Sequence, residues 1–277
     1  MARRRKGEII NGWINLDKPS DMSSSDAVNI VRRALNAQKA GHGGTLDPLA
    51  TGVLPIALGE ATKTIPFCQD HLKRYSFTIV WGEARDTDDA EGEVIEISDK
   101  RPSAQEIRAI LPHFTGEIEQ TPPQYSAIKI DGRRAYDIAR SGKTSEIPPR
   151  PVYIEALELL NTKQGSAGFE CLCGKGTYMR SLARDMAKML GTVGYIADLR
   201  RETVGPFSVD NAISLAKLRE IGDIARSETN VLEDVLLPVE TVLDDIPALA
   251  LNEKEASRLR NGQKLLFIAR PDVDRLY

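Results

Sequence analysis

The sequence predicts an α+β fold in which helices flank a mixed, largely antiparallel sheet. Three observations lead to this class. Segments of strand character follow one another as hairpin-like neighbours, helical segments carry their own capping signals, and no regular alternation of strand and helix runs through the 277 residues. The last observation argues against the βαβ repeat that builds a parallel sheet.

The N-terminal part is predicted to contain a strand, a helix and then a pair of strands. The segment "GWINLDKP" (12–19) is typical of a strand that runs into a turn. Residues 23–36 combine serine capping candidates with apolar positions on one helical face, which predicts a helix. Alternation with aromatic and β-branched residues predicts a strand over 74–83, and a strand over 91–97 is predicted to pair with it.

The middle of the chain carries further helices and strands. Ser103 and Glu106 form a capping box at the head of a short helix. An amphipathic helix is predicted over 177–191 and ends at Gly191. The other predicted elements are strands over 150–160 and 168–173, and a strand, an Asp131-Gly132 turn and a helix over 125–140.

The domain organisation is read from a change in composition near the C-terminus. An acidic stretch with two prolines lies between Leu237 and Pro247. We therefore expect a large domain over residues 1–240 and a small module over 241–277, which would be marginally stable alone.

Overall composition is that of an ordinary soluble globular protein, with 41% hydrophobic residues. The 37 basic and 40 acidic residues give a net charge of −3. This balance permits a nucleic-acid partner, because binding depends on where the charges lie. Basic residues gather in 2–6, 128–143 and 199–201, although a solvated face explains each run equally well when taken alone.

The sequence also predicts a location. No apolar run is long enough to span a bilayer, and the basic N-terminus lacks the apolar stretch of a secretory signal. The three cysteines, Cys68, Cys171 and Cys173, are too few for a disulfide framework. We expect a cytoplasmic protein, and a monomer by default.

Common cofactor and metal motifs do not fit. The Gly-Lys of "GKGTYMR" (174–180) lacks the upstream glycine of a phosphate-binding loop. The three histidines lack ligand spacing, and Cys171 and Cys173 are predicted to share one face of a buried strand. The acidic segment "DTDDAEGE" (86–93) departs from a calcium loop after three positions, so it is predicted to be a solvated loop.

One acid has an unusual setting. Asp47 is the lone acid in the first twenty residues of the run from Lys39 to Lys63. Glycines would let a substrate approach this loop closely and prolines would fix its shape, so the carboxylate is a candidate nucleophile if a cation orients it. A rigid turn with a surface aspartate explains the residues equally well. The surrounding residues are Gly41, Gly43, Gly44, Thr45, Pro48 and Gly52.

The segment "GHGGTLDPLATGVLPIALGEATK" (41–63) closely resembles the signature of the bacterial tRNA pseudouridine-55 synthases of the TruB type. The resemblance implies a pseudouridine synthase fold and the conversion of one uridine in the tRNA T-arm, at position 55, to pseudouridine. It implies base flipping and a tRNA partner, with no cofactor and no metal. Five further blocks resemble the family in its own order: 14–28, 73–93, 120–140, 173–191 and 195–207.

The resemblance assigns roles to five residues. Asp47 matches the essential carboxylate, which would either attack the anomeric carbon or deprotonate the neighbouring sugar carbon to give a glycal. Tyr75 matches the tyrosine that stacks on the flipped uracil, and it is a candidate for removing the proton from carbon 5. Arg180 matches the arginine that pairs with the aspartate, and Tyr178 and Leu199 match residues that line the pocket.

Further residues are expected to serve RNA binding. His42 resembles a residue that helps to wedge the RNA loop open. Lys18 resembles a lysine near the site, where it would contact a phosphate or support the loop. Arg133 and Arg134 belong to the segment 128–143, which we expect to clamp the RNA.

The sequence departs from the family pattern in three places. Gly43 stands where threonine or alanine is more common, and Asp21 replaces a usual glycine. The segment 249–265 resembles the opening of the family's small PUA-like RNA-binding module, and the chain ends at Tyr277, before the expected closing strands. We therefore expect this module to be incomplete.

Two other functions remain open from the sequence. One is a non-catalytic tRNA-binding or tRNA-folding protein on the same scaffold, which would need the basic surface and not Asp47. The other is a metal-dependent nuclease that uses Asp86, Asp88 and Asp89. A chelator separates the nuclease from the synthase, because only the nuclease would lose activity.

Overall fold

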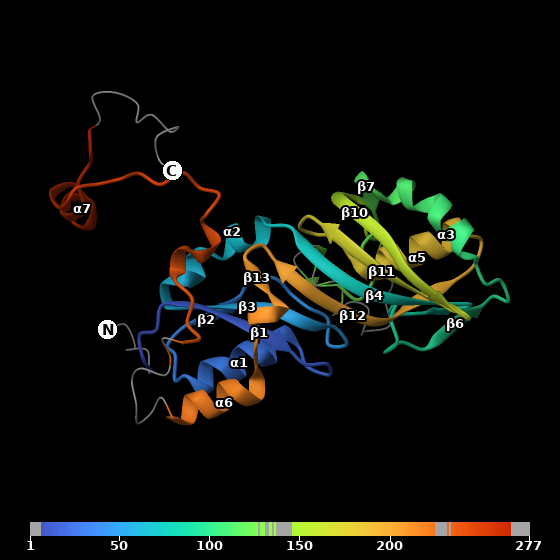
Figure 1. Cartoon of the computed structure of the whole chain (residues 1–277), viewed down its shortest axis with the longest axis horizontal. Helices are drawn as coiled ribbons and strands as arrows, with labels where there is room; N and C mark the ends of the chain where they lie inside the picture. Colours follow the sequence, from blue (N-terminus) through green and yellow to red (C-terminus); the bar gives the residue numbers. More distant parts are fainter. Residues whose placement is uncertain are drawn as a thin grey trace.

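The computed structural model describes residues 7–126, 128–130, 133, 134, 136, 146–224, 232 and 234–266. These residues build a ten-stranded sheet with the order β14-β1-β3-β12-β4-β11-β10-β7, to which β13 adds on β12 and β2 on β3 (Figure 1). The strands are β1 (Gly12–Lys18), β2 (Ala40–His42), β3 (Thr51–Leu58), β4 (Lys73–Trp81), β7 (Gly116–Gln120), β10 (Arg150–Lys163), β11 (Ser166–Cys173), β12 (Gly194–Val204), β13 (Phe207–Ser208) and β14 (Ile213–Ser214).

Most strand pairs are antiparallel, and only the β1–β14 and β3–β12 pairs among the described strands are parallel. The predicted α+β class with a mixed, largely antiparallel sheet is therefore confirmed. The helices are α1 (Ser24–Ala34), α2 (Ile65–Asp70), α3 (Ala104–Ile110), α5 (Met179–Met189), α6 (Leu215–Ile224) and α7 (Glu253–Arg260), with short 3-10 helices at Gly59–Lys63, Leu111–Phe114, Val209–Asn211 and Val239–Val242.

Helices α1 and α3 begin, and helix α5 ends, at the residues that the capping signals in the sequence predicted. The Ser23 side chain accepts a hydrogen bond from the backbone of Asp26 at the start of α1. The capping box of Ser103 and Glu106 is formed at the start of α3. Gly191 follows α5 with φ +69°, the left-handed conformation that glycine adopts at low cost.

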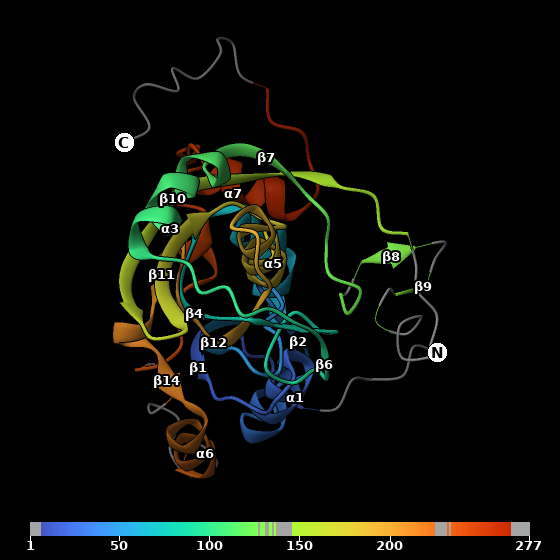
Figure 2. The ribbon, with the colours of Figure 1, turned by 90° about the vertical axis from the view of Figure 1, so that its right-hand side faces the viewer.

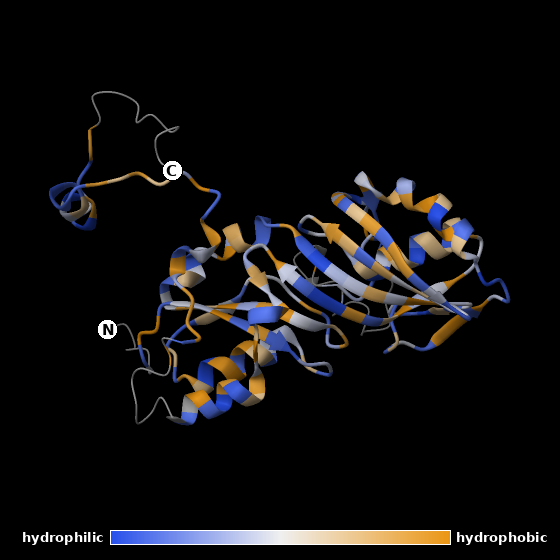
Figure 3. Cartoon of the chain, in the orientation of Figure 1, coloured by the Kyte–Doolittle hydropathy of each residue, from blue (hydrophilic) through white to orange (hydrophobic). Residues whose placement is uncertain are grey.

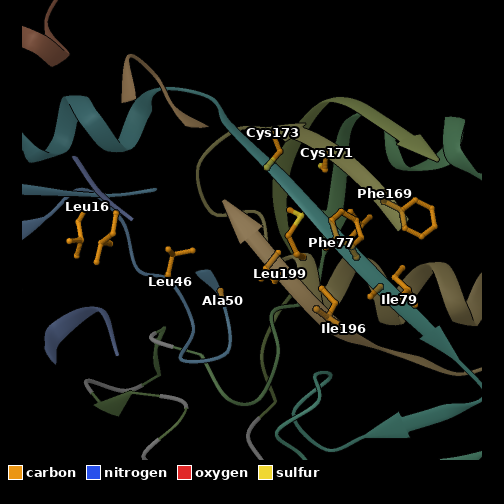
Figure 4. Close-up of a cluster of buried hydrophobic side chains, with 14 of the residues drawn as sticks. Leu16, Leu46, Ala50, Phe77, Ile79, Phe169, Cys171, Cys173, Ile196 and Leu199 are labelled. Atoms are coloured by element: carbon orange, nitrogen blue, oxygen red, sulfur yellow. The ribbon is translucent and has the colours of Figure 1, made fainter. Parts of the chain in front are cut away.

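The helices cover two parts of the sheet. Helices α1 and α6 contact each other and the strands β1, β3 and β14, whereas α5 packs on β12 and β4, and α3 beside β10 (Figure 1). One buried apolar cluster connects the two parts, from Leu16, Leu46 and Ala50 to Phe77 and Phe169 (Figure 4). The same cluster contains Cys171 and Cys173, as their alternation predicted.

The two parts of the sheet meet at a short seam. Strands β3 and β12 run parallel for two residue pairs, Arg200 with Thr51 and Arg201 with Gly52. A Cβ atom at Gly52 would lie 2.2 Å from the carbonyl oxygen of Arg201, and the φ of Gly52 is +98°. Only glycine allows this approach. The loop that carries Asp47 leads directly into β3, so it lies at this seam.

One local prediction was wrong. The strand over 91–97 begins at Val94 as β6 (Val94–Ile97) and pairs with β5 (Glu83–Arg85), not with β4. A sharp turn separates β5 from β4, since Gly82 has φ +98°. Further along the chain, Arg133 and Arg134 form β9 against β8 (Lys129–Ile130). Of the helix predicted in the last part of 125–140, Tyr136 is helical, and the residues after it lie outside the described part of the chain.

The C-terminal segment lies apart from the sheet. Helix α7 stands at the end of a long connection (Figure 1), and Figure 3 shows that its surface is largely hydrophilic. None of its residues is buried. The division at residue 240 and the PUA-like module over 241–277 stay predictions. Within the described part of the chain, no helix is long and apolar enough to cross a membrane.

Candidate active site

A pocket of about 390 Å³ lies at the seam of the sheet. Its walls come from the loop 43–47, from β4, from the segment 174–179 and from β12. Four of the five predicted active-site residues line it, although they are far apart in the sequence: Asp47, Tyr75, Tyr178 and Leu199. The fifth, Arg180, contacts Asp47 from behind.

Arg180 holds Asp47 in a two-pronged ion pair. Its Nε donates to Asp47 Oδ2 at 2.9 Å and its Nη2 donates to Asp47 Oδ1 at 3.0 Å. Such a fork fixes both the position and the rotation of a carboxylate. Arg180 is 4% exposed and Asp47 is 30% exposed, so the anion reaches the pocket while the cation stays beneath it.

Arg180 is itself fixed by neighbours on other segments. Its Nη1 donates to the Thr87 carbonyl and its Nη2 to the Tyr125 carbonyl, both at 2.9 Å. Its Nε lies 3.5 Å from Asp89 Oδ2, and the Asp89 side chain is 3% exposed. Burial works to lower the pKa of Arg180, but Asp47 and Asp89 outweigh it, so the pKa is raised and the guanidinium stays charged.

The loop around Asp47 is tied to the body on one side by Ser24 and Lys18. The buried Ser24 hydroxyl donates to the Leu46 carbonyl at 2.9 Å and accepts from the Leu46 amide at 2.8 Å. The Lys18 ammonium donates to the carbonyls of Pro19 and Met22 at 2.8 Å and to that of Pro48 at 3.2 Å.

These contacts favour one of the two expectations for Lys18, and its role toward RNA stays a prediction. Its side chain is fully buried, and burial lowers its pKa to about 8. A buried ammonium whose hydrogens point at three carbonyls supports the loop, and it is not placed to contact a phosphate.

On the other side the loop is held by Arg201, which the sequence analysis missed. This side chain is 1% exposed. Its Nε donates to the Val53 carbonyl at 2.7 Å, Nη2 to Gly44 at 3.1 Å and Nη1 to Thr45 at 3.4 Å. One guanidinium therefore joins the two limbs of the loop that carries Asp47.

Tyr75 and Tyr178 both form part of the pocket wall. Burial raises the pKa of Tyr75, and the positive charge of Arg201 works against this rise. Burial also raises the pKa of Tyr178, whose backbone amide donates to Gln120 Oε1 at 2.8 Å while Gln120 Nε2 donates to its carbonyl at 3.1 Å. Both phenols are therefore neutral at pH 7.

His42 does not line the pocket. It lies on β2, half-buried, and its Nδ1 is buried without a hydrogen-bond partner among the described residues. Burial, with a smaller effect of Arg201, lowers its pKa. Its role in RNA binding stays a prediction, as do those of Arg133 and Arg134, of which the structure describes the backbone only.

The two departures near the loop are accommodated. A Cβ atom at Gly43 would lie 2.4 Å from the Sγ of Cys68, so the thiol fills the space that a side chain at position 43 would need. Asp21 adopts φ 59°, the left-handed conformation usual for glycine, which aspartate tolerates better than most residues.

The acidic segment 86–93 is solvated only in part: Asp86, Glu91 and Glu93 are exposed, as predicted, whereas Asp88 and Asp89 turn inward. Asp89 is buried against Arg180, and Asp88 Oδ2 accepts a hydrogen bond from Arg184 at 2.9 Å. Arginines that project from α5 draw these carboxylates inward. Within the described residues, no three histidine, cysteine, aspartate or glutamate side chains converge as metal ligands.

The burial of Lys73, Asp89, Gln120 and Arg201 at this site was not predicted, because each looks like a surface residue by type. For Lys73 and Arg201, the alternation of side chains along a strand could have indicated that they lie at the site. Strand side chains alternate between faces, so Lys73 shares a face with Tyr75, and Arg201 shares one with Leu199.

The fold is similar to those of several solved structures. The chain superposes with a TM-score of 0.74 on a chain of the Cbf5-Nop10-Gar1 complex, at 26% identity, over 93% of this chain and 69% of that one. A structure of an H/ACA RNP bound to a substrate RNA containing 2'-deoxyuridine gives a TM-score of 0.71. The fold is that of the pseudouridine synthases.

Family models identify the family to which the chain belongs within this class. The N-terminal domain of TruB family pseudouridylate synthases matches residues 32–179, and the tRNA pseudouridylate synthase B C-terminal domain matches 180–244. The chain is 56% identical to tRNA pseudouridine synthase B of Bradyrhizobium diazoefficiens, over 96% of this chain and 78% of that relative. It is 54% identical to that of Caulobacter vibrioides, over 98% and 86%. The chain belongs to the TruB family of pseudouridylate synthases.

Proposed function

We propose that the protein isomerises the uridine at position 55, in the T-arm of tRNA, to pseudouridine, with Asp47 as the essential carboxylate. The observation that carries this proposal is the fork between Asp47 and Arg180 at the wall of a pocket that also contains Tyr75. This arrangement supplies a fixed anion beside a surface on which a base can stack.

The reaction requires the uridine to leave its stack. A carboxylate cannot reach the glycosidic bond of a base inside the folded RNA, so the nucleotide is flipped out of the RNA loop. The pocket of about 390 Å³ lies in the size range of small-ligand sites. Its glycine-rich wall, which includes Gly43 and Gly44, lets the sugar approach Asp47 closely.

Asp47 then acts on the sugar. It attacks the anomeric carbon, or it removes a proton from the neighbouring carbon to give a glycal. The base detaches, turns and rejoins through carbon 5, and the proton of carbon 5 is lost while nitrogen 1 gains one. We assign Tyr75 to stacking, because its raised pKa makes the phenolate that a base would need scarce at neutral pH.

The RNA is held outside the pocket by basic residues. The β8–β9 hairpin, with Arg133 and Arg134, stands apart from the sheet (Figure 2), and we propose that it contacts phosphates of the T-arm. We propose His42 as a wedge within the RNA loop and the segment 241–277 as a further RNA-binding module. The active form is proposed to be a cytoplasmic monomer.

Release of tritium from tRNA labelled at carbon 5 of its uridines tests the proposal, with EDTA present throughout. We expect release by the wild type and none by Asp47→Asn. Asp17→Asn is the matched control, because Asp17 also accepts two hydrogen bonds from one arginine, Arg200, both at 3.0 Å, and lies outside the pocket. This control should retain activity.

Three outcomes would contradict the proposal. Release by Asp47→Asn would remove the carboxylate from the reaction. If the wild type bound tRNA without releasing tritium, the chain would be a tRNA-binding or tRNA-folding protein. In a parallel reaction with Mg²⁺ in place of EDTA, cleavage of the RNA that EDTA abolishes would instead point to a nuclease that uses the carboxylates of 86–89.

A further inference from the structure

Two buried cations without carboxylate partners line the pocket on the side of Tyr75. Lys73 is 6% exposed and Arg201 is 1% exposed, and both contribute to the pocket wall. In the part of the chain that the structure describes, neither has a carboxylate within ion-pair distance. Buried charges are normally paired, because removing an ion from water is costly.

Backbone carbonyls accept hydrogen bonds from both cations. Because a carbonyl is neutral, it does not compensate their positive charge. The Lys73 ammonium donates to the carbonyls of Gln69 and His71. Burial lowers the pKa of Lys73 to about 8, and the nearby Arg201 adds to this effect. The protein thus keeps two mutually repelling cations in its interior.

Two of the three other ionisable groups that face Lys73, Asp70 and Cys68, do not neutralise it. Asp70 is engaged by Lys175 at 2.6 Å. Burial raises the pKa of Cys68 to about 11, so this thiol carries no charge at pH 7. Cys173 is the remaining group, and the hydrogen bond from Cys171 lowers its pKa.

The pocket therefore carries excess positive charge. Asp47 is the one acid among its lining residues, and Arg180 already compensates that charge. Lys73 is the residue two positions before Tyr75 on β4, and Arg201 on β12 is the cross-strand partner of Tyr75. The excess charge consequently lies beside the surface proposed to stack on the base.

A neutral uridine does not need this charge, but its detached base does. When the bond between the anomeric carbon and nitrogen 1 breaks, the electron pair stays with the uracil. The resulting anion is spread over nitrogen 1 and the two carbonyl oxygens. Fixed positive charge in a site that excludes water stabilises developing negative charge strongly.

We infer that Lys73 and Arg201 stabilise the uracil anion that exists between detachment of the base and its reattachment through carbon 5. The inference rests on the proposed function and adds a second group of residues to it. Asp47 acts on the sugar, and the two cations act on the leaving base. The charge is discharged when the base bonds to the sugar again and the proton of carbon 5 is replaced by one on nitrogen 1.

Single-turnover tritium release by Lys73 variants tests the inference. Lys73→Met keeps much of the side-chain volume and removes the charge, so we expect the rate to fall about 100-fold, as for the loss of one fixed donor to a developing anion. Lys73→Arg keeps the charge and should retain most of the rate. Lys217→Met, which removes an exposed lysine paired with Glu220, is the control and should match the wild type.

Two measurements separate stabilisation of the anion from a structural role or from phosphate binding. The Kd for tRNA should change by no more than about twofold in Lys73→Met, because the bound uridine is still neutral. On tRNA that contains 5-fluorouridine, followed by digestion and chromatography of the nucleosides, the defect of Lys73→Met should shrink about tenfold or more, because a more acidic uracil needs less stabilisation.

The outcomes are distinct. Equal defects on both substrates would overturn the inference and indicate a structural role, and a large rise in Kd with an unchanged single-turnover rate would indicate a phosphate site. A normal rate in Lys73→Met would overturn the inference while the proposed function stands. No release by the wild type would overturn both. If Lys73→Met does not fold, the wild-type rate should still decline above about pH 8, and the persistence of this decline in Lys73→Arg would overturn the inference.

Discussion

Arg180 and Asp47 form a fork in which the cation is buried and the anion is exposed to the pocket, at 4% and 30% exposure. The same guanidinium lies 3.5 Å from the buried carboxylate of Asp89. Arg180 therefore serves two acids in different ways. It orients Asp47, and it neutralises Asp89, which has little access to water.

Arg180→Met should harm both stability and activity. It leaves Asp89 as an uncompensated buried charge, which is expected to cost about 3–5 kcal/mol of the free energy of unfolding. Asp47→Asn leaves Arg180 with Asp89 and two carbonyls, so its stability should stay within about 1 kcal/mol of wild type. Urea unfolding of both variants checks this difference, and equal losses would contradict it.

Arg180→Lys isolates the geometry of the fork. Lysine keeps a charge near both acids but cannot donate two parallel hydrogen bonds to Asp47. We expect the single-turnover rate to fall by about 100-fold, with a much smaller loss of stability than in Arg180→Met. A rate close to wild type would show that charge alone, and not orientation, is what Asp47 requires.

Gly43 and Cys68 should be coupled. Gly43→Ala places a methyl group 2.4 Å from the thiol sulfur and should cost about 1–3 kcal/mol. In Gly43→Ala/Cys68→Ala the sulfur is gone, so the double variant should recover at least about 1 kcal/mol relative to the sum of the single changes. Thermal and urea unfolding of the four proteins measures this coupling, and simple additivity would contradict the contact.

Lys18 should make stability depend on pH. Its pKa is lowered from 10.5 to about 8, so between these values the unfolded chain binds more protons at this site than the folded chain. The free energy of unfolding of the wild type should therefore rise relative to Lys18→Met by up to about 1.4 kcal/mol per pH unit in this window. Below about pH 8 both states are protonated and the difference should be constant. A constant difference throughout the window would contradict a buried Lys18 cation.

Arg133 and Arg134 should matter for affinity and not for chemistry. Replacing both with alanine should weaken tRNA binding and reduce the dependence of log Kd on log salt by about 1 to 2 units of slope. The single-turnover rate at saturating enzyme should not change. An unchanged salt slope would place the RNA on another surface.

The sequence predicted the elements with strong local signals. Serine caps, a glycine terminator and residue alternation placed α1, α3, α5, β1, β4 and β11, because these signals act over a few neighbouring residues. The partner of β6 was predicted wrongly, because strand pairing is set by a turn at Gly82 and by packing between distant segments.

The site was predictable only through likeness to a family. The residues alone marked Asp47 as unusual and left a rigid turn as an equal explanation. Arg180 lies 133 positions away, and no local pattern connects it to Asp47. The burial of Asp89 and Arg201 was not predicted, because charged residues are seldom fully buried. It follows from the folded sheet, which places both side chains beneath the loop.

The seam between β3 and β12 has a consequence for the order of folding. Asp47 reaches its place only when Ser24, Lys18, Arg180 and Arg201, which come from four separate elements, surround its loop. A partly folded chain that has completed one side of the sheet would contain most of its secondary structure and lack a catalytic centre. During refolding, enzymatic activity should therefore return with the last phase and later than the circular dichroism of the sheet, which makes catalysis itself a reporter of complete assembly.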